Sequence, residues 1–383
     1  MRSQRVAVQR RPKDRKDQIL DAARTLIVAH GYRNVSMAQI ADEVGITAGA
    51  LYRHFVNKSV LLGAVIGASF DDVTPPVADG ETLDEVIAAS CAHIVARPDA
   101  GVLWWRESRN LPFEMRDDLG GRLREINQRY AYLIGLERPE LATTSAEELA
   151  WAVQSVLATP GSQASRLPSH EYGELLARAC RAVCAVEIGP PAVVSSPHGS
   201  GLVPLSKREA ILGCATALFD KNGYAATSLS EIGAAAGVTA PNLYSYFENK
   251  ADLLNVTIER GTSALWLMLH SSLRENDNPR DALIALVHGY TRLALEKTVL
   301  VGILGADEVT QTEVVRARQR EYVAEWTGLL VKARPNLGDS TARVLVHTAL
   351  GLINNMAGID HLGRNAAFEA DLTAMATAAL LFV

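Results

Sequence analysis

The sequence has no hydrophobic run long enough to cross a membrane. Its longest uncharged apolar stretches, Thr298 to Ala306 and Ala376 to Val383, fall well short of the roughly 20 residues that a transmembrane helix needs. The basic residues at the start of the chain are not followed by an apolar stretch of signal-peptide length. Together these two absences predict a cytoplasmic protein without a membrane partner.

Cysteine is scarce, and its spacing matches no metal or disulfide motif. The four residues, Cys91, Cys180, Cys184 and Cys214, include no C-x-x-C pair. In a reducing compartment such residues are mostly small buried hydrophobic side chains. We therefore expect neither a structural disulfide nor a metal site, and we expect no cofactor.

The common catalytic motifs are also missing. The sequence lacks G-x-S-x-G, a Walker loop, H-E-x-x-H and a G-x-G-x-x-G that opens a helix after a strand. His198 lies in a Gly- and Ser-rich stretch, where it would have no rigid partner. We therefore expect that the protein is not an enzyme.

Charge is present but unevenly distributed. The chain of 383 residues is 48% hydrophobic and 21% charged, a globular composition for about two or three domains. Residues 1–16 carry a net charge of +6 and the whole chain −5, which leaves −11 on the rest. A basic arm on an acidic body suggests phosphate contact at one end, although a solvated, disordered tail would have the same composition.

An internal repeat divides the chain into two units. Residues Ile19 to Leu62 align without a gap on Ile211 to Leu254, at a constant offset of 192 positions, and 18 of the 44 pairs are identical. A Pro-, Gly- and Ser-rich stretch between the units is typical of a linker. The predicted organisation is a basic arm (1–16), a first head (17–62), a first helical regulatory domain (63–187), the linker (188–205), a second head (206–254) and a second helical regulatory domain (255–383).

Each repeat contains the signals of three short helices. Ser36 with Gln39, and Ser228 with Glu231, fit the capping box that begins a helix. A glycine ends this helix, and Thr47 or Thr239 two residues later is expected to cap the next one, which should be about two turns long. Two helices joined by so tight a turn form a helix-turn-helix, whose second helix fits the major groove of DNA. A helical hairpin that only packs is the alternative.

The repeated residues resemble a known family. The order G-Y, I-A, V-G-I-T, A-L-Y-R-H-F, N-K and L-L in the first copy, largely kept in the second, is similar to the N-terminal signature of the tetracycline-repressor (TetR) family. The resemblance covers about 50 residues in each copy. It implies a DNA-binding regulator in which each helix-turn-helix domain precedes a helical domain for ligand binding and dimerisation.

The resemblance also implies roles for single residues. Hydroxyl, phenol, imidazole and ammonium groups would hold backbone phosphates: Ser36, Tyr52, His54 and Lys58 in the first head, and Ser228, Tyr244, Tyr246 and Lys250 in the second. The start of the third helix would read bases: Thr47, Ala48, Gly49 and Arg53 in the first head, and Thr239, Ala240, Asn242 and Ser245 in the second. For Arg53 a phosphate contact is an equal alternative.

The two heads differ at these reading positions. We therefore expect one chain to form a pseudo-dimer that prefers double-stranded DNA with two unlike half-sites, with further self-association left open. The second head has four basic and five acidic residues between Ser206 and Leu254 and no basic arm. The alternative is therefore a helical protein-interaction module in which the second head is structural and does not read DNA.

The regions after the heads show helical periodicity without strand patterns, so the chain is predicted to be all-α. The predicted helices cover residues 82–98, 102–110, 113–136, 145–159 and 171–188 in the first unit, and 279–296, 298–308, 313–333, 340–358 and 366–382 in the second. The resemblance implies that helices within 147–158 and 175–186 pack on helices within 343–356 and 372–381 as a four-helix bundle.

The resemblance further implies a small-molecule effector. The expected pocket has large apolar walls with few polar groups. These walls favour an apolar ligand, such as a lipid or sterol derivative, that releases a repressor from DNA. The candidate ligand residues are His93, Trp104, Trp105, Glu107 and Trp151 in the first unit and His288, Arg292, Asn354 and Asn355 in the second. For each of them, core packing is the alternative.

Overall fold

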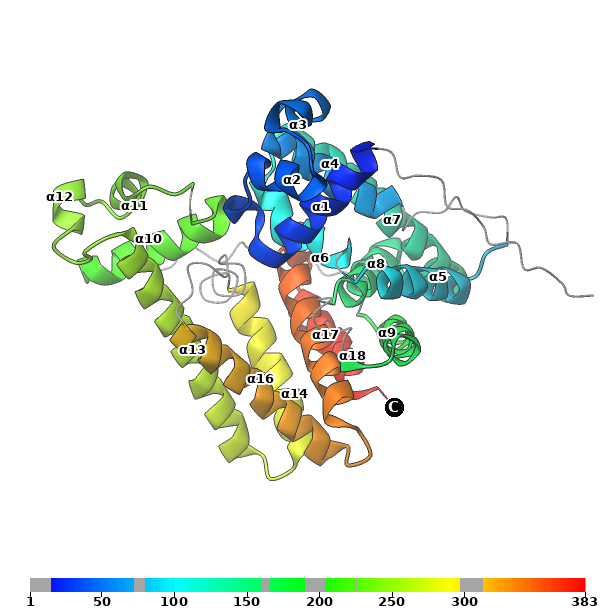
Figure 1. Ribbon diagram of the computed structural model, residues 1–383. Coiled ribbons are helices and arrows are strands. Elements are labelled where there is room, and N and C mark those ends of the chain that lie inside the picture. Colours follow the sequence, from blue (N-terminus) through cyan, green and yellow to red (C-terminus); the bar gives the residue numbers. More distant parts are fainter. Residues whose placement is uncertain are drawn as a thin grey trace, which may run out of the picture.

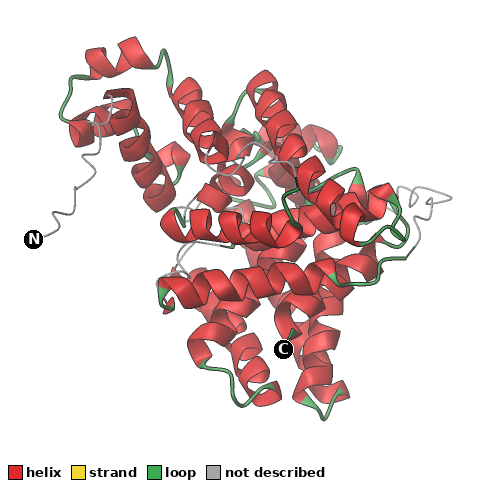
Figure 2. Cartoon of the chain, turned by 90° about the vertical axis from the view of Figure 1, so that its right-hand side faces the viewer, coloured by secondary structure: helices red, strands yellow, loops and turns green. Residues whose placement is uncertain are grey.

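The computed structural model is all-α, as the sequence predicts. It describes residues 15–71, 80–98, 100–159, 166–189, 204–224, 226–296 and 313–382. Within these ranges the elements are α-helices and 3-10 turns, with no strand (Figure 2). Most of the basic arm, most of the linker and the helix expected over residues 298–308 lie outside the described residues.

The first unit begins with its head and continues into a helical body. Its elements are α1 (Arg15–His30), η1 (Tyr32–Asn34), α2 (Met37–Val44), α3 (Ala48–His54), α4 (Lys58–Asp71), α5 (Leu83–Ala96), α6 (Ala100–Glu107), η2 (Ser108–Asn110), α7 (Phe113–Glu137), α8 (Thr143–Leu157) and α9 (Ser169–Cys184). The helix predicted to reach Ile188 ends earlier, because the Arg138 guanidinium donates to the carbonyls of Cys184 and Val186 at 2.8 and 2.7 Å and so satisfies the helix end.

The second unit repeats this order. Its elements are α10 (Lys207–Asn222), α11 (Leu229–Ala235), α12 (Ala240–Leu243), α13 (Lys250–Glu275), α14 (Pro279–Leu295), α16 (Glu313–Ala333), α17 (Asp339–Ala357), η4 (Leu362–Arg364) and α18 (Phe368–Leu381).

Local signals place the helix starts of both heads correctly. Ser36 accepts from the backbone N–H of Gln39, and the Gln39 side chain accepts from the backbone N–H of Ser36, which completes a capping box. Ser228 and Glu231 form the same box in the second head. The glycine after each of these helices has a positive φ, 70° at Gly45 and 64° at Gly237, a conformation that favours glycine.

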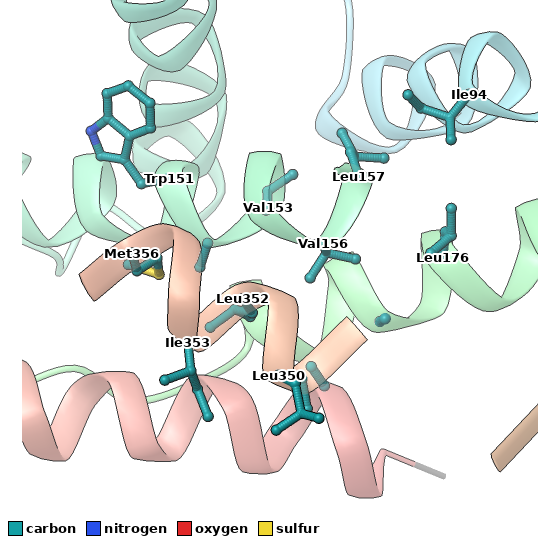
Figure 3. Packing of buried hydrophobic residues seen from close by; sticks show 14 of the residues in the cluster. Ile94, Trp151, Val153, Val156, Leu157, Leu176, Leu350, Leu352, Ile353 and Met356 are labelled. Carbon is teal, nitrogen blue, oxygen red and sulfur yellow. The ribbon is translucent and has the colours of Figure 1, made fainter. Parts of the chain in front are cut away.

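The two units meet along a layer of four helices. In Figure 1 the body of the first unit lies to the right and the long helices of the second to the lower left, with α17 and α18 next to α8 and α9. Helix α8 packs on α17, and α9 packs on α18. Figure 3 shows α8 beside α17, with Val156 of α8 pointing toward α17 and the Trp151 ring pointing away from it; Leu352, Ile353 and Met356 of α17 are buried close by.

The seam between the units, where α8 and α9 pack on α17 and α18, is mostly apolar, with a few buried polar groups. The Thr159 hydroxyl donates to the Thr348 hydroxyl at 3.1 Å across the seam. Glu148 of α8 accepts from the Asn365 side chain at 3.4 Å. Burial, together with the charge of Asp371, raises the pKa of Glu148 to about 7. A single buried cluster runs through both bodies and the first head, so the bodies share one core.

None of the helices in the described ranges has the length and apolar character needed to span a membrane.

Candidate nucleic-acid interface

Helix α3 presents a polar face outward from the first head. Leu51 and Phe55 are buried and anchor one side of the helix. Thr47 caps its start by accepting from the backbone N–H of Ala50 at 3.2 Å. On the opposite side, the Tyr52 side chain is 51% exposed, next to exposed Arg53. An exposed phenol on a short, capped helix is available to donate to phosphate.

The other residues expected at the first DNA contact lie around this helix. Thr47, Ala48, Gly49 and His54 are all exposed. The Ser36 oxygen already accepts from the backbone of Gln39, but a hydroxyl that accepts keeps its proton for donation.

Lys58 differs from the other expected contacts because it is half-buried. Its ammonium lies 4.1 Å from the centroid of the Tyr32 ring, and burial lowers the pKa of Lys58. The second head repeats the arrangement, with the Lys250 ammonium 4.3 Å from the Tyr224 ring centroid. Each lysine therefore makes a cation–π contact with a tyrosine of its own head.

Helix α12 of the second head is shorter than predicted. It has four residues, Ala240–Leu243, and Thr239 makes no side-chain capping bond. The expectation that Thr239 caps a helix of about two turns is therefore wrong. The helix ends early because of the next turn, in which both the Ser245 backbone N–H and its hydroxyl donate to the Asn242 carbonyl, at 3.2 and 2.6 Å. These bonds tighten the chain to an i, i+3 pattern.

The second head still exposes residues of the expected types. Asn242, Ser245 and Ser228 are exposed, and the Tyr244 and Tyr246 side chains are 57% and 40% exposed. Leu243 and Phe247 are buried beneath them. In Figure 1, α3 and α12 both lie at the outer edges of their heads, away from the four-helix layer.

The first head is tied to its body by a polar network around Glu107. The Glu107 side chain is buried and accepts from Arg106 at 2.9 Å and from Asn110 at 3.0 Å. Arg106 also donates to the carbonyls of Ile27 and Val28, at the end of α1 where a helix lacks its own donors. Charge-assisted bonds of this kind are stronger than neutral ones, so α6 holds the end of α1.

Arg33 extends this network toward the second head. Its guanidinium donates to the Asn110 side-chain oxygen at 3.0 Å. A Cβ on Gly223, in the second head, would lie 3.6 Å from another Arg33 nitrogen. The charge of Arg33 also contributes to the lowered pKa of Lys250, after burial. The two heads thus approach each other at Arg33.

The second head is mounted differently. Its buried residues form a separate cluster from the main core. It joins the body through α13, a continuous helix of 26 residues, and through Val315 of α16, which belongs to the same small cluster. The Arg260 guanidinium also makes two bonds to the Glu209 carboxylate at 2.6 and 2.9 Å. A small cluster and a surface ion pair hold a head more weakly than the main core does.

The first-unit ligand candidates are divided among packing contacts. The Trp104 ring lies 5.9 Å from Phe70, and Trp105 lies 6.4 Å from Trp151. Trp151 also lies 6.3 Å from His361 of the second unit. His93 is half-buried on α5. The structure therefore brings Trp105 and Trp151 together, while Glu107 bonds to Arg106 and Asn110.

The second-unit candidates are also spread out. Asn354 exchanges hydrogen bonds with the Tyr290 hydroxyl at 3.2 and 3.3 Å. His288 lies 3.4 Å from the Glu369 carboxylate. Arg292 is exposed and Asn355 half-buried.

Sequence reasoning missed Arg33, Arg106 and Asn110, since their partners lie as far as 79 positions away in the chain.

Several known proteins that are similar to this chain are named as transcriptional regulators. A family described as "Bacterial regulatory proteins, tetR family" matches residues 19–65 and again 211–257. Over 124 residues the chain is 29% identical to the HTH-type transcriptional repressor KstR2 of Rhodococcus jostii (strain RHA1). This match covers 29% of this chain and 61% of that protein. Over 114 residues it is 30% identical to the HTH-type transcriptional regulator HbdR of Aromatoleum sp. (strain CIB), with 27% and 48% covered.

The chain therefore matches only about half to three-fifths of the length of these two relatives. Among solved structures, the crystal structure of AibR in complex with isovaleryl coenzyme A and operator DNA is 25% identical, with a TM-score of 0.36; the match covers 39% of this chain and 86% of that one.

Proposed function

From the premise that this chain belongs to the tetR family and carries its DNA-binding domain twice, we propose that it is a ligand-responsive transcriptional repressor. Its two non-equivalent units pair within one chain and bind an operator whose half-sites differ. In this proposal residues 17–62 and 206–254 are the DNA-binding heads, and residues 63–187 and 255–383 are the regulatory domains.

The observation that carries the proposal is the exposed face of each reading helix. Tyr52 and Tyr244 are large side chains with more than half of their surface exposed, although each has a buried leucine beside it. Exposed rings on a folded surface indicate a binding surface. Here the neighbours include Arg53 and Asn242, which suit guanine and adenine respectively.

Pairing within one chain is supported by the seam. Helices α8 and α9 pack on α17 and α18, and their buried side chains belong to one apolar cluster. Apolar faces of this kind are typical of obligate interfaces. A partner on the same chain is also present at a high effective concentration.

Repression and the effector are the further parts of the proposal. The relative from Rhodococcus jostii is named a repressor, which supports repression by this chain. The effector is proposed to be a small apolar molecule, lipid- or sterol-like, because Trp104, Trp105 and Trp151 supply large apolar rings to the first body.

The test is a DNA-binding measurement with the full chain and the DNA upstream of its own and adjacent genes. Footprinting locates the site, and light scattering measures the mass of the free and bound protein. The proposal predicts one chain per site, a footprint with two unlike halves, and affinity that falls as salt is raised because phosphate contacts release counterions.

A second candidate function rests on the short α12. If the second head is structural, Lys250→Ala with Tyr244→Phe will leave affinity unchanged, and the footprint will be symmetric with two chains bound. Absence of DNA binding at moderate salt, or binding insensitive to salt, would instead indicate a helical module that binds a protein partner.

A further inference from the structure

A groove of about 860 Å³ follows α18 at the seam between the units. Its walls come from α9 of the first unit and from α14 and α18 of the second, three helices that lie together in Figure 1. Most lining side chains are small or apolar, among them Ala182, Ile284, Ala370, Ala374, Ala378 and Leu381. Because α18 has 14 residues, the groove is about 20 Å long.

The two ends of the groove differ in charge. At one end His288 of α14 lies 3.4 Å from the Glu369 carboxylate of α18. Arg280, also in the lining, precedes His288 by about 12 Å along α14. The other end is lined by Phe382, which follows α18. The Glu369–His288 pair therefore lies at one end of the groove, and Arg280 lies toward the other end.

Three arginines gather at the Phe382 end. The Arg178 guanidinium carbon lies 5.2 Å from the Phe382 ring centroid, and Arg178 is one turn before Ala182 on the same face of α9. Arg334, which follows α16, is half-buried. Burial and the charges of Arg178 and Arg280 lower the pKa of Arg334.

These guanidiniums lack negative partners in the part of the chain that the structure describes. None of the three makes an ion pair with a described residue, and the Arg334 Nη1 atom is buried without a hydrogen-bond partner. The Thr377 hydroxyl, farther along the groove, is likewise buried without a partner. Leaving such donors unpaired costs free energy, and crowding like charges adds to it.

A long apolar groove with arginines at one end complements a molecule that has an alkyl tail and an anionic head. The small side chains of α18 leave room for an alkyl chain, whose burial is favourable. A carboxylate or a phosphate accepts two bonds from one guanidinium and relieves the repulsion among three. A neutral apolar molecule would fill the groove and leave the arginines unpaired.

We propose that this groove binds an amphipathic anion, with its alkyl chain along α18 and its carboxylate or phosphate head at Arg280, the one of the three arginines that lines the groove, within the positive field of Arg178 and Arg334. The site lies on the seam, apart from the Trp105–Trp151 cluster. A ligand there touches α9 of one unit and α14 and α18 of the other, so that it holds the two units together. The inference concerns this groove alone and does not require that the chain bind DNA.

Isothermal titration calorimetry with the full chain tests the site. The probes are decanoate, decyl phosphate and decan-1-ol, each below the concentration at which it aggregates. We expect one anion per chain and decanol at least about tenfold weaker, the worth of a charge-assisted bond. Decanoate and decyl phosphate separate the two head groups, and preference for either one supports the site.

Three variants locate the binding. Arg280→Gln, an exposed position that folding tolerates, should weaken the anions about tenfold and leave decanol unchanged. Ala374→Trp should fill the groove and abolish binding of all three probes, with its unfolding temperature measured alongside. Arg274→Gln removes an exposed guanidinium of the same unit that does not line the groove and should change nothing.

Equal affinity for decanoate and decanol, or full anion binding by Arg280→Gln, would overturn the proposal. So would an absence of binding by any probe, including the case in which light scattering shows a second chain seated on this face.

Discussion

The two heads have the same internal plan but are held by different means. The first shares the main core and is tied to α6 through Glu107. The second has its own small core and stands on α13, braced by the Arg260–Glu209 pair. Residues inside the repeat set how each head folds, whereas residues outside it set how each head is mounted. Similarity between repeats therefore does not imply equal stability or equal motion.

The largest contrast is expected from equivalent core truncations. Leu51 and Leu243 occupy the same position in the two repeats, and both are fully buried. Each leucine-to-alanine change should cost about 3 kcal/mol locally. Leu51→Ala should lower the stability of the whole molecule, while Leu243→Ala should loosen only the second head.

Hydrogen exchange resolved by segment, together with calorimetry, distinguishes these outcomes. Protection lost only over 207–258 in Leu243→Ala would sharpen the comparison. Protection lost equally throughout both variants would show that the two mounts are equivalent.

The seam provides a test that acts on both heads together. Burial raises the pKa of Glu148 from its ordinary value of 4.5 to about 7, so the folded chain binds more protons than the unfolded chain between those values. The free energy of unfolding should therefore fall as pH rises from about 4.5 to 7, by at most about 3 kcal/mol. Glu148→Gln should flatten this part of the profile, measured by urea unfolding.

Glu174→Gln, at an exposed position of the neighbouring helix α9, is the control, and it should not flatten this part of the profile. A pH slope that persists in Glu148→Gln would assign the effect to another group.

DNA affinity should show the next difference. Replacing Tyr52 by Phe, Arg53 by Ala and His54 by Ala removes donors from a capped helix of seven residues and should weaken operator binding about 100-fold. The corresponding changes at Tyr244, Ser245 and Tyr246 should cost only about tenfold, because α12 has four residues and no cap.

Both affinities are measured by fluorescence anisotropy at several salt concentrations, with circular dichroism as the control for folding. Equal losses would mean that α12 lengthens on DNA and that the heads contribute alike.

The smallest effect is expected from the mounts themselves. Glu107→Gln removes the charge from a buried group with two donors and should destabilise the first head by about 2 kcal/mol. Glu209→Gln breaks an exposed ion pair in the second mount and should cost about 0.5 kcal/mol. Thermal unfolding of both variants checks the order, and a larger loss in Glu209→Gln would reverse the comparison.

Local sequence alone determined the helices, their starts and the two-unit plan. Ser36 with Gln39 and Ser228 with Glu231 form capping boxes, as predicted, because capping depends on residues only three positions apart. The helix-turn-helix could be recognised for the same reason. In each head a leucine and the phenylalanine four residues later are buried, Leu51 with Phe55 and Leu243 with Phe247. This local spacing indicates which side of the helix is exposed.

Only the tertiary structure decided how these parts are joined. The network from Arg33 through Asn110 to Glu107, the shared core at the seam and the arginines around Phe382 all combine residues distant in the chain. Periodicity reports which face of a helix is buried, but it carries no information about which other helix, or which charge, will cover that face.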